Sequence, residues 1–113
     1  MKRPARTYVV VLVTCASRRE AGRIARSVVA HKLSACVNVF ETPVGSVYRW
    51  KGKIEQGREF LLLMKSSRSR LAALQAEVER LHSYDVPEFI AVPIVGGSAR
   101  YLAWLGDCLR GKP

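Results

Sequence analysis

The sequence has few cysteines and no long apolar run. It contains three cysteines, Cys15, Cys36 and Cys108, an odd number without a C-x-x-C pair, so neither a disulfide framework nor a zinc knuckle is predicted. No apolar run approaches the ~20 residues of a membrane-spanning helix, so no membrane partner is expected. The basic N-terminus is followed by a short β-branched run and not by a cleavage site, which argues against a secretory signal. A reducing cytoplasm is therefore the predicted location.

Acidic residues are also scarce, with 9 Asp and Glu against 19 Lys and Arg and a net charge of +10. Such a surface attracts polyanions, and Arg18, Arg19, Arg23 and Arg26 recur along one predicted helix. The other charges are scattered, which is typical of an ordinary solvated surface. Nucleic acid is therefore not the leading partner.

The length of 113 residues and the hydrophobic content of 49% suit one folded domain. Residues 1–6 contain Lys2, Arg3 and Arg6 and are interpreted as a flexible basic arm. Residues 7–113 are interpreted as a single domain.

The most distinctive stretch is residues 44–65, which we interpret as one long β-hairpin. Tyr48 and Trp50 share a face because side chains alternate along a strand. Lys51 and Gly52 supply the tight turn, since glycine accepts the positive φ that hairpin turns require. The second arm ends in the apolar run 60–64, and Gly57 within it predicts a bulge or bend.

The elements before the hairpin are a strand, a helix and a second strand. Residues 8–14 are nearly all apolar and β-branched, which predicts a strand covered on both faces or a central strand. Ser17 and Glu20 form a capping box that begins a helix reaching about Lys32. Residues 33–40 are predicted to form the next strand segment.

After the hairpin, Ser66 and Ser67 are predicted to begin a second helix. Residues 89–95 are predicted to form an apolar strand, which Pro93 confines to a sheet edge or to a position where its backbone nitrogen faces outward. Ser98 is placed to cap a last helix. The order β-α-β-β-α-β plus a C-terminal helix predicts an α+β fold of the ferredoxin-like, split βαβ type, with two helices on one face of an antiparallel sheet.

The length of the hairpin predicts self-association. With roughly ten residues in each arm, it would overhang a small sheet. It would then expose Tyr48, Trp50 and a free strand edge that invites pairing. Joining several copies through such edges removes both exposures, so a compact homo-oligomer is expected.

Several motifs in the same order resemble the CutA family of divalent-cation tolerance proteins, over about residues 7–110. The matching segments are Ala35–Asn38, Ser46–Lys53, Glu59, Lys65, His82–Glu88 and Tyr101–Trp104. The resemblance implies a ferredoxin-like fold assembled as a trimer, with sheets joined between subunits through the long hairpin. It also implies a role in tolerance to copper and other divalent ions. The sequence offers no nucleophile-base pairing and no phosphate-binding glycine loop, so an enzyme is not expected.

The chain departs from the family pattern in two places. The segment between Asn38 and Ser46 is about two residues longer than the resemblance leads us to expect, which predicts a bulge at the strand entry. Leu81 and Val13 stand where some members carry a histidine and a cysteine. A copper site built from a thiol and two imidazoles is therefore incomplete in this chain.

The candidate metal ligands are His82, Cys15 and Cys36, because copper favours thiolate and imidazole groups. Cys15 follows the first strand at the start of a helix, where the helix dipole favours a thiolate, so it is the more reactive candidate. Cys36, in an Ala-Cys-Val strand, is more typical of a small buried hydrophobe than of a ligand. Cys108 fits core packing. The sequence spacing alone does not show that these groups converge.

A second group mixes an imidazole, a phenol, two carboxylates and an ammonium group: His82, Tyr84, Glu59, Glu88 and Lys65. At a subunit junction, such a group can bind a metal ion or a small anion. It can equally form an inter-subunit salt-bridge network, because buried polar groups need partners whatever the function. The hairpin residues predicted to line the same cleft are Ser46, Tyr48, Trp50 and Lys51.

The leading hypothesis is a homotrimeric divalent-cation tolerance protein that binds copper or another divalent ion. One alternative is a trimeric sensor of a small anionic ligand at the subunit clefts, by analogy with the PII signalling proteins. Another is a basic nucleic-acid-binding module in which Tyr48 and Trp50 stack on bases. Against the last, the chain lacks an aromatic pair on its central strands.

Overall fold

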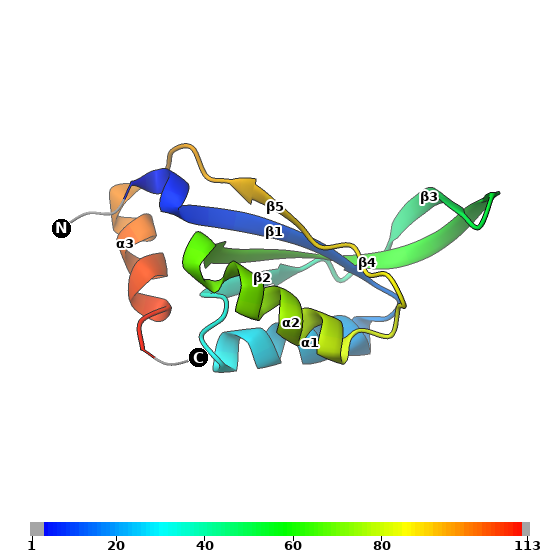
Figure 1. Ribbon diagram of the computed structural model, residues 1–113, viewed down its shortest axis with the longest axis horizontal. Coiled ribbons are helices and arrows are strands. Elements are labelled where there is room, and N and C mark those ends of the chain that lie inside the picture. The colour runs from blue at the N-terminus through cyan, green and yellow to red at the C-terminus, as the bar shows by residue number, and fades with distance from the viewer. Residues whose placement is uncertain (1–3, 112–113) are drawn as a thin grey trace.

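The computed structural model describes residues 4–111, and Figure 1 shows a sheet with two helices on one face, a third helix at one end and a long hairpin at the other. Two short 3₁₀ turns, η1 and η2, precede the first strand and the second helix. The elements in chain order are η1 (Ala5–Thr7), β1 (Tyr8–Cys15), α1 (Arg18–Ala30), β2 (Cys36–Val39), β3 (Val44–Trp50), β4 (Lys53–Ser67), η2 (Arg68–Arg70), α2 (Leu71–Leu81), β5 (Ile90–Pro93) and α3 (Ala99–Cys108).

The sheet has the strand order β2-β4-β1-β5, and β3 pairs with the outer part of β4. Every pairing is antiparallel. The β1–β4 register runs from Tyr8 opposite Ser67 to Cys15 opposite Phe60. This topology confirms the predicted ferredoxin-like α+β fold, and β1, which lies between β4 and β5, is the central strand that its apolar sequence predicted.

The main core lies between the sheet and the pair α1 and α2. Alternate residues of β1, such as Val11 and Val13, point into it and are fully buried. Ile24 of α1 and Leu74 of α2 meet them at the helical spacing expected from the sequence. Burying an aliphatic side chain of this size contributes roughly 1.5–3 kcal/mol, so this layer holds the helices to the sheet.

A smaller hydrophobic cluster holds α3 against the end of the sheet that lies away from the hairpin (Figure 1). Tyr8, at the start of β1, packs with Leu105 of α3 and with Leu109, which directly follows that helix. Ser98 caps this helix by accepting a hydrogen bond from the amide of Tyr101, as the sequence predicted. The C-terminal helix therefore lies against strand ends and not within the main core.

The hairpin of β3 and β4 projects beyond the rest of the chain (Figure 1). With the hairpin included, the molecule has extents of 50 × 25 × 24 Å. Trp50 lies opposite Lys53, and both residues of the connecting turn, Lys51 and Gly52, have positive φ. This is the tight two-residue turn that the sequence predicted. Apolar side chains on the arm are exposed within the single chain, including Val47 at 70%.

The predicted bulge lies where the chain passes from β2 to β3. Val39 is opposite Leu62 and Val44 is opposite Glu59, so residues 40–43 face only residues 60–61. This is the bulge expected at the strand entry. The bulge predicted at Gly57 was wrong, because the β3–β4 register continues without interruption past that residue.

Three element boundaries differ from prediction. Ser66 and Ser67 do not begin a helix. They end β4, where Ser66 Oγ donates to the carbonyl of Leu33, and α2 begins after η2. The strand predicted over residues 33–40 is shorter, because the amides of Leu33 and Ser34 bond to the carbonyl of Val28 and close the end of α1. The last strand is shorter too, because it runs only from Ile90 to Pro93, but it lies at the sheet edge as predicted.

The predicted basic arm lies partly outside the described residues, which exclude residues 1–3 and 112–113. From Ala5 the chain forms η1, so regular structure begins two residues earlier than predicted. None of the helices between residues 4 and 111 has both the length and the apolar character needed to span a membrane.

Candidate functional site

Three side chains of metal-ligand type converge at the end of β1. Cys15 is the last residue of the strand, Glu20 lies in the first turn of α1, and His82 directly follows α2. One ligand atom from each lies within 4.8 Å of the others. The structure thus brings together two of the predicted metal ligands. Glu20 was read from the sequence only as a capping residue, although its place in the helix that follows Cys15 brings its carboxylate to that strand end.

The carboxylate of Glu20 joins two segments of the chain. The backbone amide of Glu20 donates to Ser17 Oγ at 3.1 Å, which confirms half of the capping box. Its Oε1 accepts from the amide of Ala16 at 3.3 Å, one residue earlier than the capping box predicts. Its Oε2 accepts from the amide of Ser83 at 2.7 Å and so binds the loop after α2 to the start of α1.

The ring of His82 has hydrogen bonds on both nitrogens. Nδ1 accepts from the amide of Tyr84 at 3.1 Å, because a backbone amide can only donate. Nε2 therefore carries the proton and donates to the carbonyl of Thr14 at 2.7 Å. The single lone pair of this neutral imidazole is on Nδ1, so a metal ion bound there would replace the bond from Tyr84.

Cys15 is a buried thiol and not the reactive thiolate that the sequence predicted. Burial in the core, followed by the nearby carboxylates of Glu20 and Glu59, raises its pKa to about 12. These effects outweigh the dipole of α1, which would favour the charged form. At neutral pH the group is a neutral thiol, and a metal ion would have to displace its proton.

A second polar group adjoins the first one. Glu59 lies on β4 next to Phe60, the partner of Cys15, and its Oε2 accepts a 2.9 Å hydrogen bond from the hydroxyl of Tyr84. Burial and this bond raise the pKa of Tyr84. Burial and the charge of Glu59 raise the pKa of Glu88. Three carboxylates therefore gather at this end of the sheet, in a chain of net charge +10.

Cys36 and Lys65 do not join these groups within the chain. They are opposite each other in the β2–β4 pairing, and Lys65 is also opposite Val10, five residues before Cys15. That separation along β1 corresponds to about 17 Å. Lys65 Nζ instead donates to Asn38 Oδ1. Within one chain, the structure therefore brings Cys15 and His82 together with Glu20 and leaves Cys36 apart from them.

The predicted cleft residues on the hairpin lie along β3 and its turn. Among them Tyr48 is near enough to Tyr84 to contribute to its raised pKa. Trp50 is 41% exposed, and Lys51 Nζ lies 5.9 Å from the centre of its ring. Ser46 is opposite Gly57 in the hairpin. Their role between subunits stays a prediction.

Comparison with known proteins gives a consistent result. The family model described as "CutA1 divalent ion tolerance protein" matches residues 9–108. "Protein CutA, chloroplastic" from Arabidopsis thaliana is 45% identical over 90% of the chain and 56% of the relative. "Divalent-cation tolerance protein CutA" from Thermus thermophilus is 42% identical over 87% of the chain and 94% of the relative. The chain thus spans little more than half of the plant relative.

Solved structures agree in fold. The "Periplasmic divalent cation tolerance protein CutA" from Archaeoglobus fulgidus has a TM-score of 0.88 and 36% identity, covering 91% of this chain and 99% of that one. The names of these relatives refer to different compartments, so the cytoplasmic location stays a prediction. A family model spanning most of the chain, relatives above 40% identity and the same fold together show that the protein belongs to the CutA1 divalent ion tolerance family.

Proposed function

We propose that the protein binds a divalent transition-metal ion, copper(II) foremost, through Cys15, Glu20 and His82, and that it acts in cation tolerance as a homotrimer without catalysing a reaction. The observation that carries the proposal is the convergence of these three groups, from three separate segments, within 4.8 Å of one another. Thiolate and imidazole suit copper and zinc, and a carboxylate completes a mixed set that such ions accept.

Metal binding at this site would break some existing bonds and use others that already fix a ligand in place. Cys15 must lose its proton, and His82 Nδ1 must exchange the amide of Tyr84 for the ion. Glu20 already has both oxygens bound by amides, which fix its position. Groups that fix the orientation of a ligand in this way raise metal affinity.

The local charge favours a cation over an anion. Glu20, Glu59 and Glu88 gather at this end of the sheet, and the raised pKa of Glu88 reflects burial together with the charge of Glu59. A bound cation would offset this crowding, whereas an anionic ligand would increase it. The reading of this cleft as a sensor site for a small anion is therefore the weaker one.

Two free strand edges support the homotrimer. β5 pairs only with β1, and β3 pairs only with β4, within residues 4–111. Both carry exposed apolar side chains, including Ile90 at 52% and Val47 at 70%. Pairing between copies through the hairpin would satisfy these edges and cover the side chains.

Isothermal titration with copper(II) tests the metal site. We expect Cys15→Ser, Glu20→Gln and His82→Ala each to weaken binding by about ten- to a hundredfold. The matched controls are Cys36→Ser and His31→Ala, which remove the same groups elsewhere and should bind as the parent does. Equal affinity in the parent and all three site variants would refute the site.

Sedimentation equilibrium tests the assembly. A trimer has a mass of about 38 kDa, three times the 12.6 kDa of the chain. A monomer at micromolar concentration would contradict the proposal. Because metal affinity and mass are measured separately, either part can fail without the other.

A further inference from the structure

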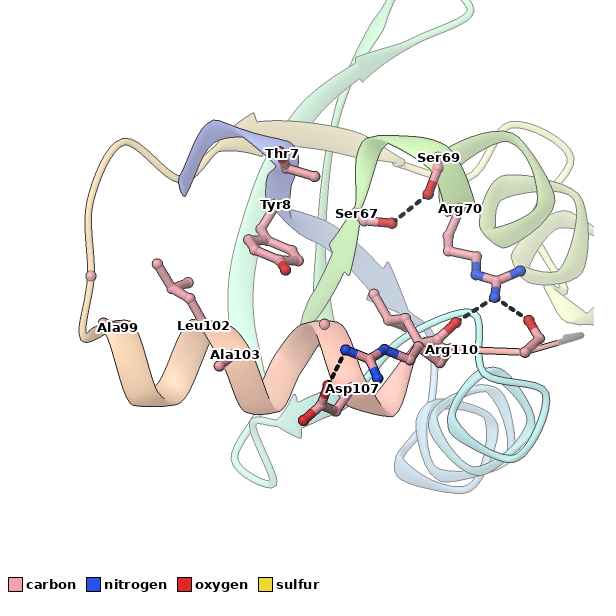
Figure 2. A pocket seen from close by; sticks show the side chains of 14 residues that line it. Thr7, Tyr8, Ser67, Ser69, Arg70, Ala99, Leu102, Ala103, Asp107 and Arg110 are labelled. Carbon is pink, nitrogen blue, oxygen red and sulfur yellow. Dashed lines mark hydrogen bonds and ion pairs between the residues drawn. The ribbon is translucent and has the colours of Figure 1, made fainter. Parts of the chain in front are cut away.

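The end of the sheet opposite the cation site contains a hollow of about 540 Å³ between α3 and the first residues of β1 (Figure 2). That volume is in the range of small-molecule sites in proteins. Polar side chains of β1, β4 and η2 form one wall, including Tyr8, Ser67 and Arg70. Small and apolar side chains of α3, including Leu102 and Ala103, form the facing wall.

The hydroxyl of Tyr8 is the first sign of a ligand. The side chain is only 4% exposed, yet its hydroxyl has no hydrogen-bond partner among the described residues. Every fully enclosed side-chain polar atom in the described part of the chain has a partner, so this hydroxyl must be open to the hollow. It is directed at Gly106 of α3, where an added Cβ would lie 2.4 Å from it.

The charge on the same wall is the second sign. Arg70 Nη2 donates to the carbonyls of Leu109 and Gly111, and Figure 2 shows both bonds. Neither partner is a carboxylate, and Nε and Nη1 have no hydrogen bond or ion pair within residues 4–111. Asp107, the acidic residue of the lining, is paired with Arg110 at 2.9 Å. The hollow therefore has an excess positive charge.

We propose that this hollow binds a small organic anion, a carboxylate or a phosphate monoester with a compact apolar body. Arg70 offsets the charge of the anion, and the hydroxyl of Tyr8 donates a hydrogen bond to it. The hydroxyls of Ser67 and Ser69, which are 3.0 Å apart, have one hydrogen left to donate after bonding each other. The apolar body packs on Leu102. The proposal is independent of the cation site, which uses other residues at the other end of the sheet.

Titration of the full chain with phenyl phosphate, and separately with benzoate, followed by amide NMR, tests the proposal. We expect saturable shifts at Tyr8, Ser67 and Gly106, with a Kd of about 1 mM or tighter. Inorganic phosphate, which lacks the apolar body, should bind more weakly than phenyl phosphate. The two arms also show whether the hollow prefers a phosphate or a carboxylate.

Tyr8→Phe removes only the unpaired hydroxyl and should weaken binding about three- to tenfold, the loss of one hydrogen bond. Tyr101→Phe makes the same change on α3 outside the hollow and should leave the affinity unchanged. Arg70→Lys keeps the positive charge but loses the planar donor group, and it should also weaken binding. Unchanged far-UV circular dichroism shows that each variant is folded.

Three results would overturn the proposal. Shifts that spread over the arginines of α1 without saturating would indicate screening of surface charge. Equal affinities of the parent and Tyr8→Phe would exclude the hydroxyl from binding. Resonances of the hollow that respond to protein concentration instead of the probe would show that a second copy fills it.

Discussion

The hydroxyl of Tyr84 donates a 2.9 Å hydrogen bond to Glu59 Oε2 and thereby links the loop after α2 to the base of the long hairpin. Glu59 is opposite Val44, the first residue of β3, so this bond lies where the hairpin leaves the sheet. The same loop is fixed by His82 and by Glu20. The candidate cation site and the base of the hairpin therefore share one hydrogen-bonded segment.

A double-mutant cycle measures this link. Tyr84→Phe and Glu59→Ala each remove the bond, and we expect a coupling free energy of about 1 kcal/mol, the net value of one hydrogen bond to a partly exposed carboxylate. Urea unfolding of the parent, both single variants and the double variant provides the values. A coupling of zero would mean that the bond does not hold the loop to the hairpin in solution.

Glu77 joins α1 to α2 and should make the free energy of unfolding depend on pH. Arg80 donates to both of its oxygens, at 2.9 and 2.7 Å, and Ser27 Oγ of α1 donates to Oε2 at 2.5 Å. The hydrogen bonds from Arg80, and then that from Ser27, lower the pKa of Glu77 to about 2. A carboxyl whose pKa is lowered by folding stabilises the folded state above its ordinary pKa of 4.5. That contribution is lost as pH falls from about 4.5 to about 2.

Glu77→Gln should therefore lower the urea midpoint at pH 7 and flatten its decrease between pH 4.5 and 2. The control is Glu79→Gln on the same helix, whose carboxylate accepts one bond from Gln75 and does not reach α1. The measurement is a set of urea unfolding curves across this pH range. Parallel pH profiles for Glu77→Gln and the parent would contradict the assignment.

The thiol of Cys15 should resist alkylation in the folded protein. It is fully buried and its pKa is about 12, so both access and the thiolate form are lacking at pH 8. We expect iodoacetamide to leave Cys15 unmodified in native protein and to modify it in urea, as measured by peptide mass spectrometry. Modification at the same rate in both conditions would show that the strand end is open.

Local patterns predicted most of the fold. The β-branched run of β1, the capping box at Ser17 and the Lys51–Gly52 turn each depend on neighbouring residues, so the sequence alone was enough to identify them. The bulge before β3 was likewise predicted from the length of the segment between Asn38 and Ser46. The helix start predicted at Ser66 and Ser67 was wrong, because the pairing of these residues with β1 overrides their local preference for a helix start.

The site was less predictable because it depends on where distant segments meet. Cys15 and His82 could be nominated by residue type, but Cys36 is of the same type and lies at the other end of the sheet. The strand register decides between them, and composition does not contain that information. Glu20 was missed as a candidate ligand because its capping role already accounted for its position. The reactivity of Cys15 was misjudged because burial cannot be weighed against a helix dipole before the core is known.

The contact between Tyr8 and Gly106 gives the sharpest test of how α3 is attached. Replacing glycine by alanine inside a helix ordinarily stabilises it by up to about 1 kcal/mol. At Gly106, however, the new Cβ would lie 2.4 Å from the Tyr8 hydroxyl, and overpacking of this kind costs about 1–3 kcal/mol. Gly106→Ala should therefore destabilise the protein, as measured by the urea midpoint.

The same substitution should change sign once the hydroxyl is removed. In a Tyr8→Phe background the nearest remaining atom, Cζ, is 3.4 Å from the added Cβ, which is close to ordinary contact. Gly106→Ala should then be neutral or stabilising. Gly57→Ala, whose Cβ would meet nothing within 4 Å, controls for the loss of glycine and should respond equally in both backgrounds. If Gly106→Ala destabilises both backgrounds alike, the hydroxyl is not directed at α3, and the hollow beside it lacks the polar group on which anion binding depends.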